Sequence, residues 1–328
     1  MTPRMVAASM SRWIPEPQAD SARTMASSVS NAPASSCSTT LQTSLVELIR
    51  RTSTVLPDDV ITAVQAAKGV EHSGTNAAYA LEVIDCNIGL AKAKSQPLCQ
   101  DTGSILFYVH TPVGYDQISF EEIAVAAVQE ATAKGYLRQN SVDSITGKNS
   151  GDNTGPGTPE FHFHQWRKNH VEVKLMLKGG GCENVGATYT LPNPKFGGRD
   201  LKGVENAILD CVLQAQGQGC GPGILGVGLG GDRVSSMACG KQQLLRLLND
   251  TNPDEVLAGL EERVVTKANQ SGIGPMGFGG KTTLLGCKVG KLNRVPASFF
   301  VAISYMCWAF RRRGIELTTD GSITTWLY

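Results

Sequence analysis

The spacing of hydrophobic and polar residues divides the chain into helical and strand-like segments behind a polar N-terminal stretch. We predict helices at residues 43–67, 75–94, 120–137, 200–217, 232–249 and 253–270. Short apolar runs predict strands at residues 104–110, 160–166, 170–178, 224–227, 282–292 and 296–308. Because helices and strands mix without a regular βαβ alternation, we predict an α+β (mixed α/β) fold with irregular mixed sheets.

The N-terminal 42 residues differ in composition from the rest of the chain. They are rich in Ser, Ala, Thr and Pro and show no sustained hydrophobic period. We interpret residues 1–42 as a disordered leader and residues 43–328 as one folded domain. Three arginines in the leader suit an organellar targeting segment, whereas its two acidic residues argue against one. We therefore expect a cytoplasmic protein, with a mitochondrial or other organellar location as the alternative.

Charge and cysteine content exclude several classes of protein. The net charge is +1, and no basic tract interleaved with aromatic residues is present, so we expect no nucleic acid partner. The longest apolar run, residues 299–310, is too short to cross a bilayer, so we expect no membrane association. The nine cysteines form no CxxC pair and are odd in number, which favours a reducing compartment over a disulfide framework.

Glycine-rich loops adjoin several of the apolar segments. They lie at residues 146–159, 178–181, 217–223 and 272–280. Glycine allows the backbone to approach a ligand closely and exposes N–H donors, so converging loops would form a polar cavity suited to anions. The alternative for any one of these loops is an ordinary turn.

Three cysteines have neighbours that set them apart. Cys99 precedes Gln-Asp-Thr-Gly, Cys220 lies between glycines, and Cys307 ends an apolar strand. A soft thiolate ligand beside an amide and a carboxylate suits a metal centre that also binds a substrate. Cys86, Cys211 and Cys239 fall in predicted helices, where packed thiols are expected. The roles of Cys182 and Cys287 are undecided.

Five segments together give the chain a family resemblance. They are Pro97-Leu-Cys-Gln-Asp-Thr-Gly103, Asn153-Thr-Gly-Pro-Gly157, Lys178-Gly-Gly-Gly-Cys-Glu-Asn184, Ile273-Gly-Pro-Met-Gly-Phe-Gly-Gly-Lys-Thr-Thr283, and Pro296-Ala-Ser298 with Cys307-Trp-Ala309 and Arg311-Arg312. From about residue 41 to its end, the chain resembles the α-region of the iron–sulfur (class I) fumarate hydratases and L-tartrate dehydratases. The resemblance implies a [4Fe–4S] cluster held by Cys99, Cys220 and Cys307.

The resemblance also implies a reaction and a substrate site. Three thiolates leave one iron without a protein ligand, and that iron can act as a Lewis acid in the reversible hydration of fumarate to L-malate. Gln100 and Asp101 would contact the dicarboxylate substrate, with Asp101 as candidate acid–base or orienting group. Arg138 would clamp a carboxylate, to which a planar guanidinium is suited. A surface arginine is the alternative for Arg138. Gly181 would offer its N–H.

Two departures from the family pattern limit this interpretation. Val295 stands where the family has an active-site histidine, so turnover would be impaired or another group has replaced the histidine. The complete catalyst also needs a β-region, as a separate β subunit or a C-terminal β domain, and a higher homo- or hetero-oligomer is expected. The alternatives are an L-tartrate dehydratase α subunit and a non-catalytic cluster-binding subunit.

Two further patterns were considered and set aside. Residues 226–231 fit the dinucleotide pattern GxGxxG, but Asp250 is predicted to end the following helix and not a second strand. His162 and His164 fall on one face of a strand and could form a zinc pair, but no third ligand is nearby. A half-exposed strand face explains the two histidines better.

Overall fold

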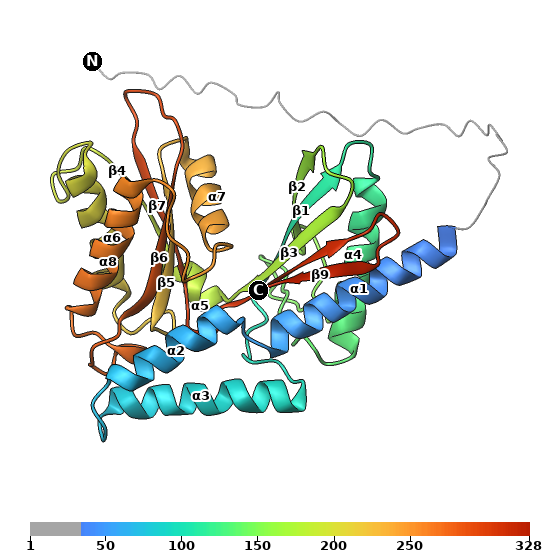
Figure 1. The fold of residues 1–328 in the computed structure, drawn as a ribbon, viewed down its shortest axis with the longest axis horizontal. Coiled ribbons are helices and arrows are strands. Elements are labelled where there is room, and N and C mark those ends of the chain that lie inside the picture. Colours follow the sequence, from blue (N-terminus) through green and yellow to red (C-terminus); the bar gives the residue numbers. More distant parts are fainter. Residues whose placement is uncertain (1–33) are drawn as a thin grey trace, which may run out of the picture. The chain divides into compact units, whose positions relative to one another are not determined.

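Two mixed sheets carry the fold in the computed structural model, which describes residues 34–328 (Figure 1). One has the strand order β2-β1-β3-β8-β9 and the other β4-β7-β5-β6. The strands are β1 (Ser104–Pro112), β2 (Glu160–Trp166), β3 (Val171–Lys178), β4 (Ala187–Thr190), β5 (Gly223–Leu229), β6 (Leu284–Lys291), β7 (Phe300–Met306), β8 (Arg311–Leu317) and β9 (Ile323–Leu327). Each sheet combines one parallel pair, β1–β2 or β5–β6, with antiparallel pairs. The α+β prediction is confirmed.

Each predicted helix has an observed counterpart in the same order, and some boundaries differ. The observed helices are α1 (Ala34–Thr54), α2 (Asp58–Val70), α3 (Asn76–Lys94), α4 (Gln117–Ala133), α5 (Gly180–Asn184), α6 (Leu201–Ala215), α7 (Arg233–Gln243) and α8 (Glu255–Asn269), with a 3-10 turn at Pro275–Gly277. Helix α5 was not predicted. The single helix predicted at 43–67 is wrong, because Pro57 is extended and separates α1 from α2. None of the described helices has the length and apolarity needed to span a membrane.

The predicted leader overlaps the first helix. Helix α1 already begins at Ala34, so residues 34–42 are helical, and the earlier part of the predicted leader lies outside the described residues. The apolar face of α1 carries Leu45, Leu48 and Ile49, which are fully buried against the β1 sheet. Burial of this face stabilises the helix more than local propensity does.

Helices cover both sheets and enclose three cores. Helices α1 and α4 pack on the β1–β3–β8 sheet. Helices α6 and α8 cover one face of the other sheet, and α7 covers its opposite face (Figure 1). A third core joins α2 and α3 to residues of both sheets and contains Cys182 and Cys307. The two sheets therefore meet where two of the cysteines lie.

The GxGxxG stretch has a packing role. Gly226 and Gly228 lie within β5, and a Cβ atom on Gly228 would be 1.9 Å from the carbonyl oxygen of Ser236 in α7. Glycine at these positions lets α7 approach the strand closely. The predicted position of Asp250 at a helix end is wrong, because α7 ends at Gln243.

Gly228→Ala is expected to lower the free energy of unfolding by about 3 kcal/mol, because the added methyl group overlaps helix backbone that cannot move alone. Urea unfolding followed by circular dichroism measures the effect. The matched control is Gly89→Ala in α3, where an added Cβ meets no atom within 4 Å and the higher helix propensity should stabilise by about 1 kcal/mol. Equal effects of the two substitutions would contradict the close packing of α7.

Candidate active site

The three cysteines predicted as cluster ligands lie on three separate segments. Cys99 precedes β1, Cys220 precedes β5, and Cys307 follows β7 at the start of the crossover to β8, residues 307–310. A hydrogen bond joins the crossover to the segment that carries Cys220, because the Trp308 N–H donates to the Cys220 carbonyl oxygen at 3.4 Å. Strand pairing of Ile224 with Met306 brings the same two segments to one end of the sheet.

The predicted ligands and Cys182 lie close enough to act on one another's pKa. Burial raises the pKa of Cys220, and the thiols of Cys182 and Cys99 raise it further. The hydrogen bond to Cys182 and burial raise the pKa of Cys307, and Cys99 acts in the same direction. Cys220 is exposed, Cys99 is partly exposed, and Cys307 is 6 % exposed. The fold therefore brings together all three predicted ligands.

Cys182 is a fourth thiol in this group, and the sequence left its role undecided. It lies in α5, is 3 % exposed, and donates from Sγ to the Gly219 carbonyl oxygen at 3.8 Å. The hydrogen bond with Cys307 lowers the pKa of Cys182 to about 7, burial opposes this, and the charge of Lys178 supports it. Lys178 is itself fully buried, and its Nζ lies 3.1 Å from a carboxylate oxygen of Glu183.

The remaining cysteines lie elsewhere in the described part of the chain. Cys211 and Cys239 are buried in α6 and α7, as predicted for packed thiols, and burial raises the pKa of Cys211 to about 12. Cys287 is buried in β6. Cys86 lies in α3 as predicted but is exposed, so the expectation of a packed thiol is wrong there.

Three hydrogen bonds fix the Asp101 carboxylate. Its Oδ1 accepts from the Gly103 N–H at 2.8 Å and from the Asn140 side chain at 2.5 Å, and its Oδ2 accepts from the Gly180 N–H at 2.7 Å. Gly103 has φ +76°, and a Cβ there would lie 2.4 Å from the Lys178 backbone. The turn therefore requires glycine in order to hold Asp101 against the first turn of α5.

The other predicted substrate residues surround Asp101. Gln100 and Gly181 are exposed, and an added Cβ on Gly181 would meet no atom within 4 Å, so its backbone faces open space. Arg138 is exposed and lies beyond the end of α4. Its N–H donates to the Thr102 hydroxyl at 2.9 Å, and that hydroxyl donates to the Arg138 carbonyl oxygen at 2.7 Å. The Arg138 backbone is thus anchored to Thr102, the residue after Asp101.

Two asparagines that support this arrangement were missed by the sequence analysis. Asn153 is 2 % exposed, has φ +63°, and donates to the Arg138 carbonyl oxygen at 2.9 Å. Its Oδ1 accepts from the Asn140 N–H at 2.7 Å, and the Asn140 side chain contacts Asp101. The Asn-Thr-Gly-Pro-Gly segment was the available signal, because asparagine beside glycine and proline is typical of a turn with a left-handed residue.

Val295 lies far from the thiols within the chain. It is on the β6–β7 loop, at the opposite end of β7 from Cys307, and β7 has seven residues, which span about 20 Å. Its side chain is 64 % exposed. The neighbouring Arg294 donates to three carbonyl oxygens of the same loop. Within this chain, the side chain at position 295 therefore lies outside the group of residues around Asp101.

The group of cysteines fits a cluster better than a single metal ion. Within the described residues, no three or more His, Cys, Asp or Glu side chains are placed to hold one metal ion. A four-iron cluster is held at separate corners, so its thiolates lie farther apart than ligands of one ion. Three thiols on three segments, with the buried Lys178 side chain beside them, are donors of the kind that such a cluster takes.

The two histidines of β2 belong to an aromatic surface. His162 stacks on Tyr108 at 4.5 Å between ring centroids, and His164 stacks on His110 at 5.3 Å. Both have neighbours on β1, in the register given by the parallel pairing. This stacking explains the positions of His162 and His164 without a bound metal ion.

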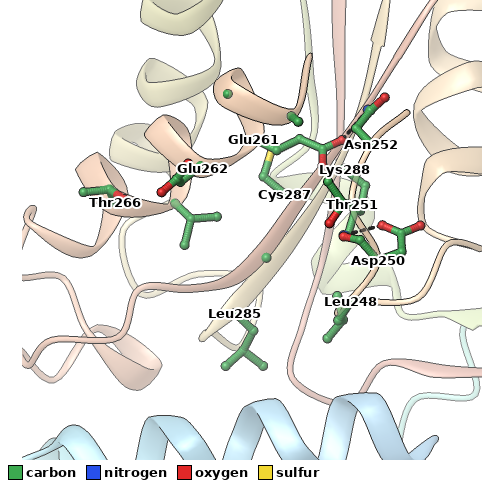
Figure 2. Close-up of a pocket in the computed structure, with 14 residues that line it drawn as sticks. Leu248, Asp250, Thr251, Asn252, Glu261, Glu262, Thr266, Leu285, Cys287 and Lys288 are labelled. Carbon is green, nitrogen blue, oxygen red and sulfur yellow. Dashed lines mark hydrogen bonds and ion pairs between the residues drawn. The ribbon is translucent and has the colours of Figure 1, made fainter. Parts of the chain in front are cut away.

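A pocket away from the cysteines is lined by an ion network. It has a volume of about 420 Å³ and lies among α8, β6 and the residues around Asp250 (Figure 2). The Oε1 atom of Glu261 accepts from Arg246, Asn252 and the Val289 N–H. These groups satisfy one another and none is a predicted site residue, so we assign the network to stability.

The chain is similar to known proteins along most of its length. The family model for Fumarate hydratase (Fumerase) matches residues 42–316. A Geobacillus stearothermophilus protein, provisionally named fumarate hydratase class I, is 51% identical over 293 residues, which are 88% of this chain and 57% of the relative. The chain thus spans little more than half of that relative.

Two shorter relatives are covered more fully. The L(+)-tartrate dehydratase subunit alpha of Escherichia coli (strain K12) is 31% identical over 270 residues, 82% of this chain and 88% of the relative. A Methanocaldococcus jannaschii protein, provisionally named for the same subunit, is 32% identical over 286 residues, 85% of this chain and 98% of the relative. With these matches and the family model, this chain belongs to the fumarate hydratase (Fumerase) family.

Proposed function

We propose that this chain is the α subunit or α domain of a [4Fe–4S]-dependent hydro-lyase that interconverts fumarate and L-malate. The observation that carries the proposal is the convergence of Cys99, Cys220 and Cys307 beside the oriented carboxylate of Asp101. The three thiolates would hold the cluster, which when bound supplies a Lewis acid at the iron without a protein ligand.

The chain's own residues would bind and orient the dicarboxylate. The exposed Arg138 guanidinium and the open Gly181 N–H can each hold a carboxylate group, and Gln100 can donate or accept a hydrogen bond at the same surface. Hydration adds a hydroxyl group to one carbon of the double bond and a proton to the other. Asp101, fixed by three donors, would hold or move that proton through one carboxylate oxygen.

The names and sequence identities of the relatives favour fumarate as the substrate of this chain. The relative at 51% identity is named a fumarate hydratase, whereas those named for tartrate dehydratase are 31% and 32% identical. L-tartrate, another 2-hydroxy dicarboxylate, is the second candidate, because these relatives match most of the chain. A few polar contacts can change such a preference.

We further propose that the active enzyme contains a β subunit or a β domain. Two relatives are named as alpha subunits, and the longer one extends well beyond the matched region. The exposed positions of Gln100, Arg138 and Gly181 leave the substrate face open for such a partner. Solvent-accessible thiols at Cys99 and Cys220 suit a reducing compartment such as the cytoplasm.

An anaerobic activity assay of the co-expressed αβ complex tests the proposal. We expect about four irons per α chain and hydration of fumarate faster than dehydration of L-tartrate. A tartrate preference would replace fumarate with the second candidate. A fully loaded complex without turnover on either substrate would support a non-catalytic subunit, and Val295→His would then show whether the missing histidine is the cause. An iron-free complex would contradict the proposal that this chain binds a cluster.

A further inference from the structure

Three consecutive arginines open β8, and in the described part of the chain only the first has no hydrogen-bond acceptor for its guanidinium. The Arg312 guanidinium pairs with the Asp59 carboxylate and stacks on the Phe310 ring at 4.2 Å. Arg313 donates to the carbonyl oxygens of Tyr328 and Val55. Arg311 is 1 % exposed, and its Nε and Nη1 atoms have no hydrogen-bond partner among the described residues.

A buried guanidinium without an acceptor is energetically unfavourable. Some nitrogen atoms of Arg312 and Arg313 are also unpartnered, but each of those side chains has an acidic or carbonyl acceptor elsewhere on its guanidinium. Leaving a charge buried and unpaired costs several kcal/mol. The position of Arg311 therefore implies that a negatively charged group binds next to it.

The location of Arg311 identifies where that anion must lie. Arg311 follows Cys307 by four positions and pairs across the sheet with Leu177, just before the turn that contains Gly179. A Cβ on Gly179 would lie 3.9 Å from Arg311 Nη2 and 3.2 Å from Asp101 Oδ2, so the guanidinium lies at the candidate site. The hydrogen bond to Cys182 and burial raise the pKa of Cys307, and the Arg311 charge opposes both.

We propose that Arg311 is a positioning residue for the cluster, donating from Nε and Nη1 to the sulfur of the Cys307 thiolate or to a cluster sulfide. This inference rests on the proposed function. A cluster held by three thiolates is an anionic group, and hydrogen bonds to its sulfur atoms help to set its reduction potential and stability. Arg311 would thus supply the donors and the positive charge that the buried side of the cluster needs.

Burial distinguishes this role from substrate binding. The Nε and Nη1 atoms of Arg311 are buried, whereas Arg138 is exposed beside Asp101. A substrate that arrives from solvent meets Arg138 first, while Cys307 shares the buried side with Arg311. Lys178 is a less suitable donor, because Glu183 already lies within 3.1 Å of its ammonium group.

The test compares anaerobically purified αβ complexes that carry Arg311→Met, Arg311→Lys or Arg138→Met with the unsubstituted complex. Three properties are measured: iron per chain, the rate of iron release to a chelator, and the reduction potential of the cluster from a titration followed by electron paramagnetic resonance. We expect Arg311→Met to release iron about 10-fold faster and to lower the potential. Arg311→Lys, which keeps the charge but not the planar donors, should lie between. Arg138→Met should leave the iron content, the rate of iron release and the reduction potential unchanged.

The outcomes separate the two proposals. An unsubstituted complex without iron overturns the proposed function. A loaded complex in which Arg311→Met changes neither iron release nor the potential overturns the role of Arg311 alone. Thermal unfolding of each iron-free variant shows whether the fold is kept. If Arg311→Met does not fold, Arg311→Lys decides, and an unchanged potential in that variant overturns the role.

Discussion

For the proposed hydro-lyase, Cys307→Ser is expected to leave the chain without iron and the assembled complex with at most about one-thousandth of the unsubstituted hydratase activity. A thiolate is the ligand that iron–sulfur clusters require, and a serine hydroxyl at a buried position does not replace it. The Lewis acid contributes several kcal/mol to such a reaction, which corresponds to a loss of about 10³-fold or more. Iron analysis, absorption spectra and fumarate hydration of the anaerobic complex measure the effect.

Cys239→Ser provides the matched control for this substitution. Cys239 is buried to nearly the same degree, 7 % against 6 % exposed, but lies in α7. The complex that carries Cys239→Ser should keep the iron content of the unsubstituted complex. Full iron content in Cys307→Ser would show that the ligand set is wrong. Cys182→Ser would then test the neighbouring thiol as the third ligand, because the two side chains share a hydrogen bond.

Asp101→Asn is expected to reduce kcat by about 10²- to 10⁴-fold while iron content stays the same, which is the usual effect of removing a proton-transfer group. The amide has nearly the same shape but cannot take up a proton. Its NH₂ group would also face one of the donors that now bind the carboxylate, among them the Gly180 N–H. Steady-state kinetics with fumarate and L-malate, together with iron analysis, measure both properties.

Asp116→Asn controls for the loss of a carboxylate at an exposed position. Asp116 caps α4 by accepting from two backbone N–H groups, and asparagine caps helices about as well as aspartate. Its kcat should therefore be unchanged. If Asp101→Asn kept full kcat and raised only KM, Asp101 would orient the substrate without taking part in proton transfer.

Much of the site could be predicted because its residues lie in short, distinctive segments. Cys99 to Asp101 adjoin one another, and Cys220 lies in a glycine-rich turn, so their neighbours marked them as unusual. Their roles as ligands and substrate residues were implied by the family resemblance. Periodicity identified α3, α6 and α8 within two residues of their ends, because each buries a regular apolar face.

The features that were missed depend on contacts between residues distant in sequence. Strand β8 opens with three arginines, a pattern typical of a surface, and burial of Arg312 requires Asp59 from the other end of the chain. Helix α5 is five residues long and begins with glycines, which locally favour a loop. The distance of Val295 from the thiols follows from the direction of β7 in the sheet, which sequence periodicity does not encode.

The crossover between β7 and β8 would give the proposed cluster a structural role. Cys99 leads into one sheet, Cys220 leads into the other, and Cys307 lies on the short peptide that joins them. A cluster bound to all three cysteines would crosslink the two sheets of the subunit. Oxygen that strips the iron would then do more than stop turnover, because the loosened chain becomes a better substrate for proteases. The protein would consequently be degraded faster in cells at higher oxygen concentration.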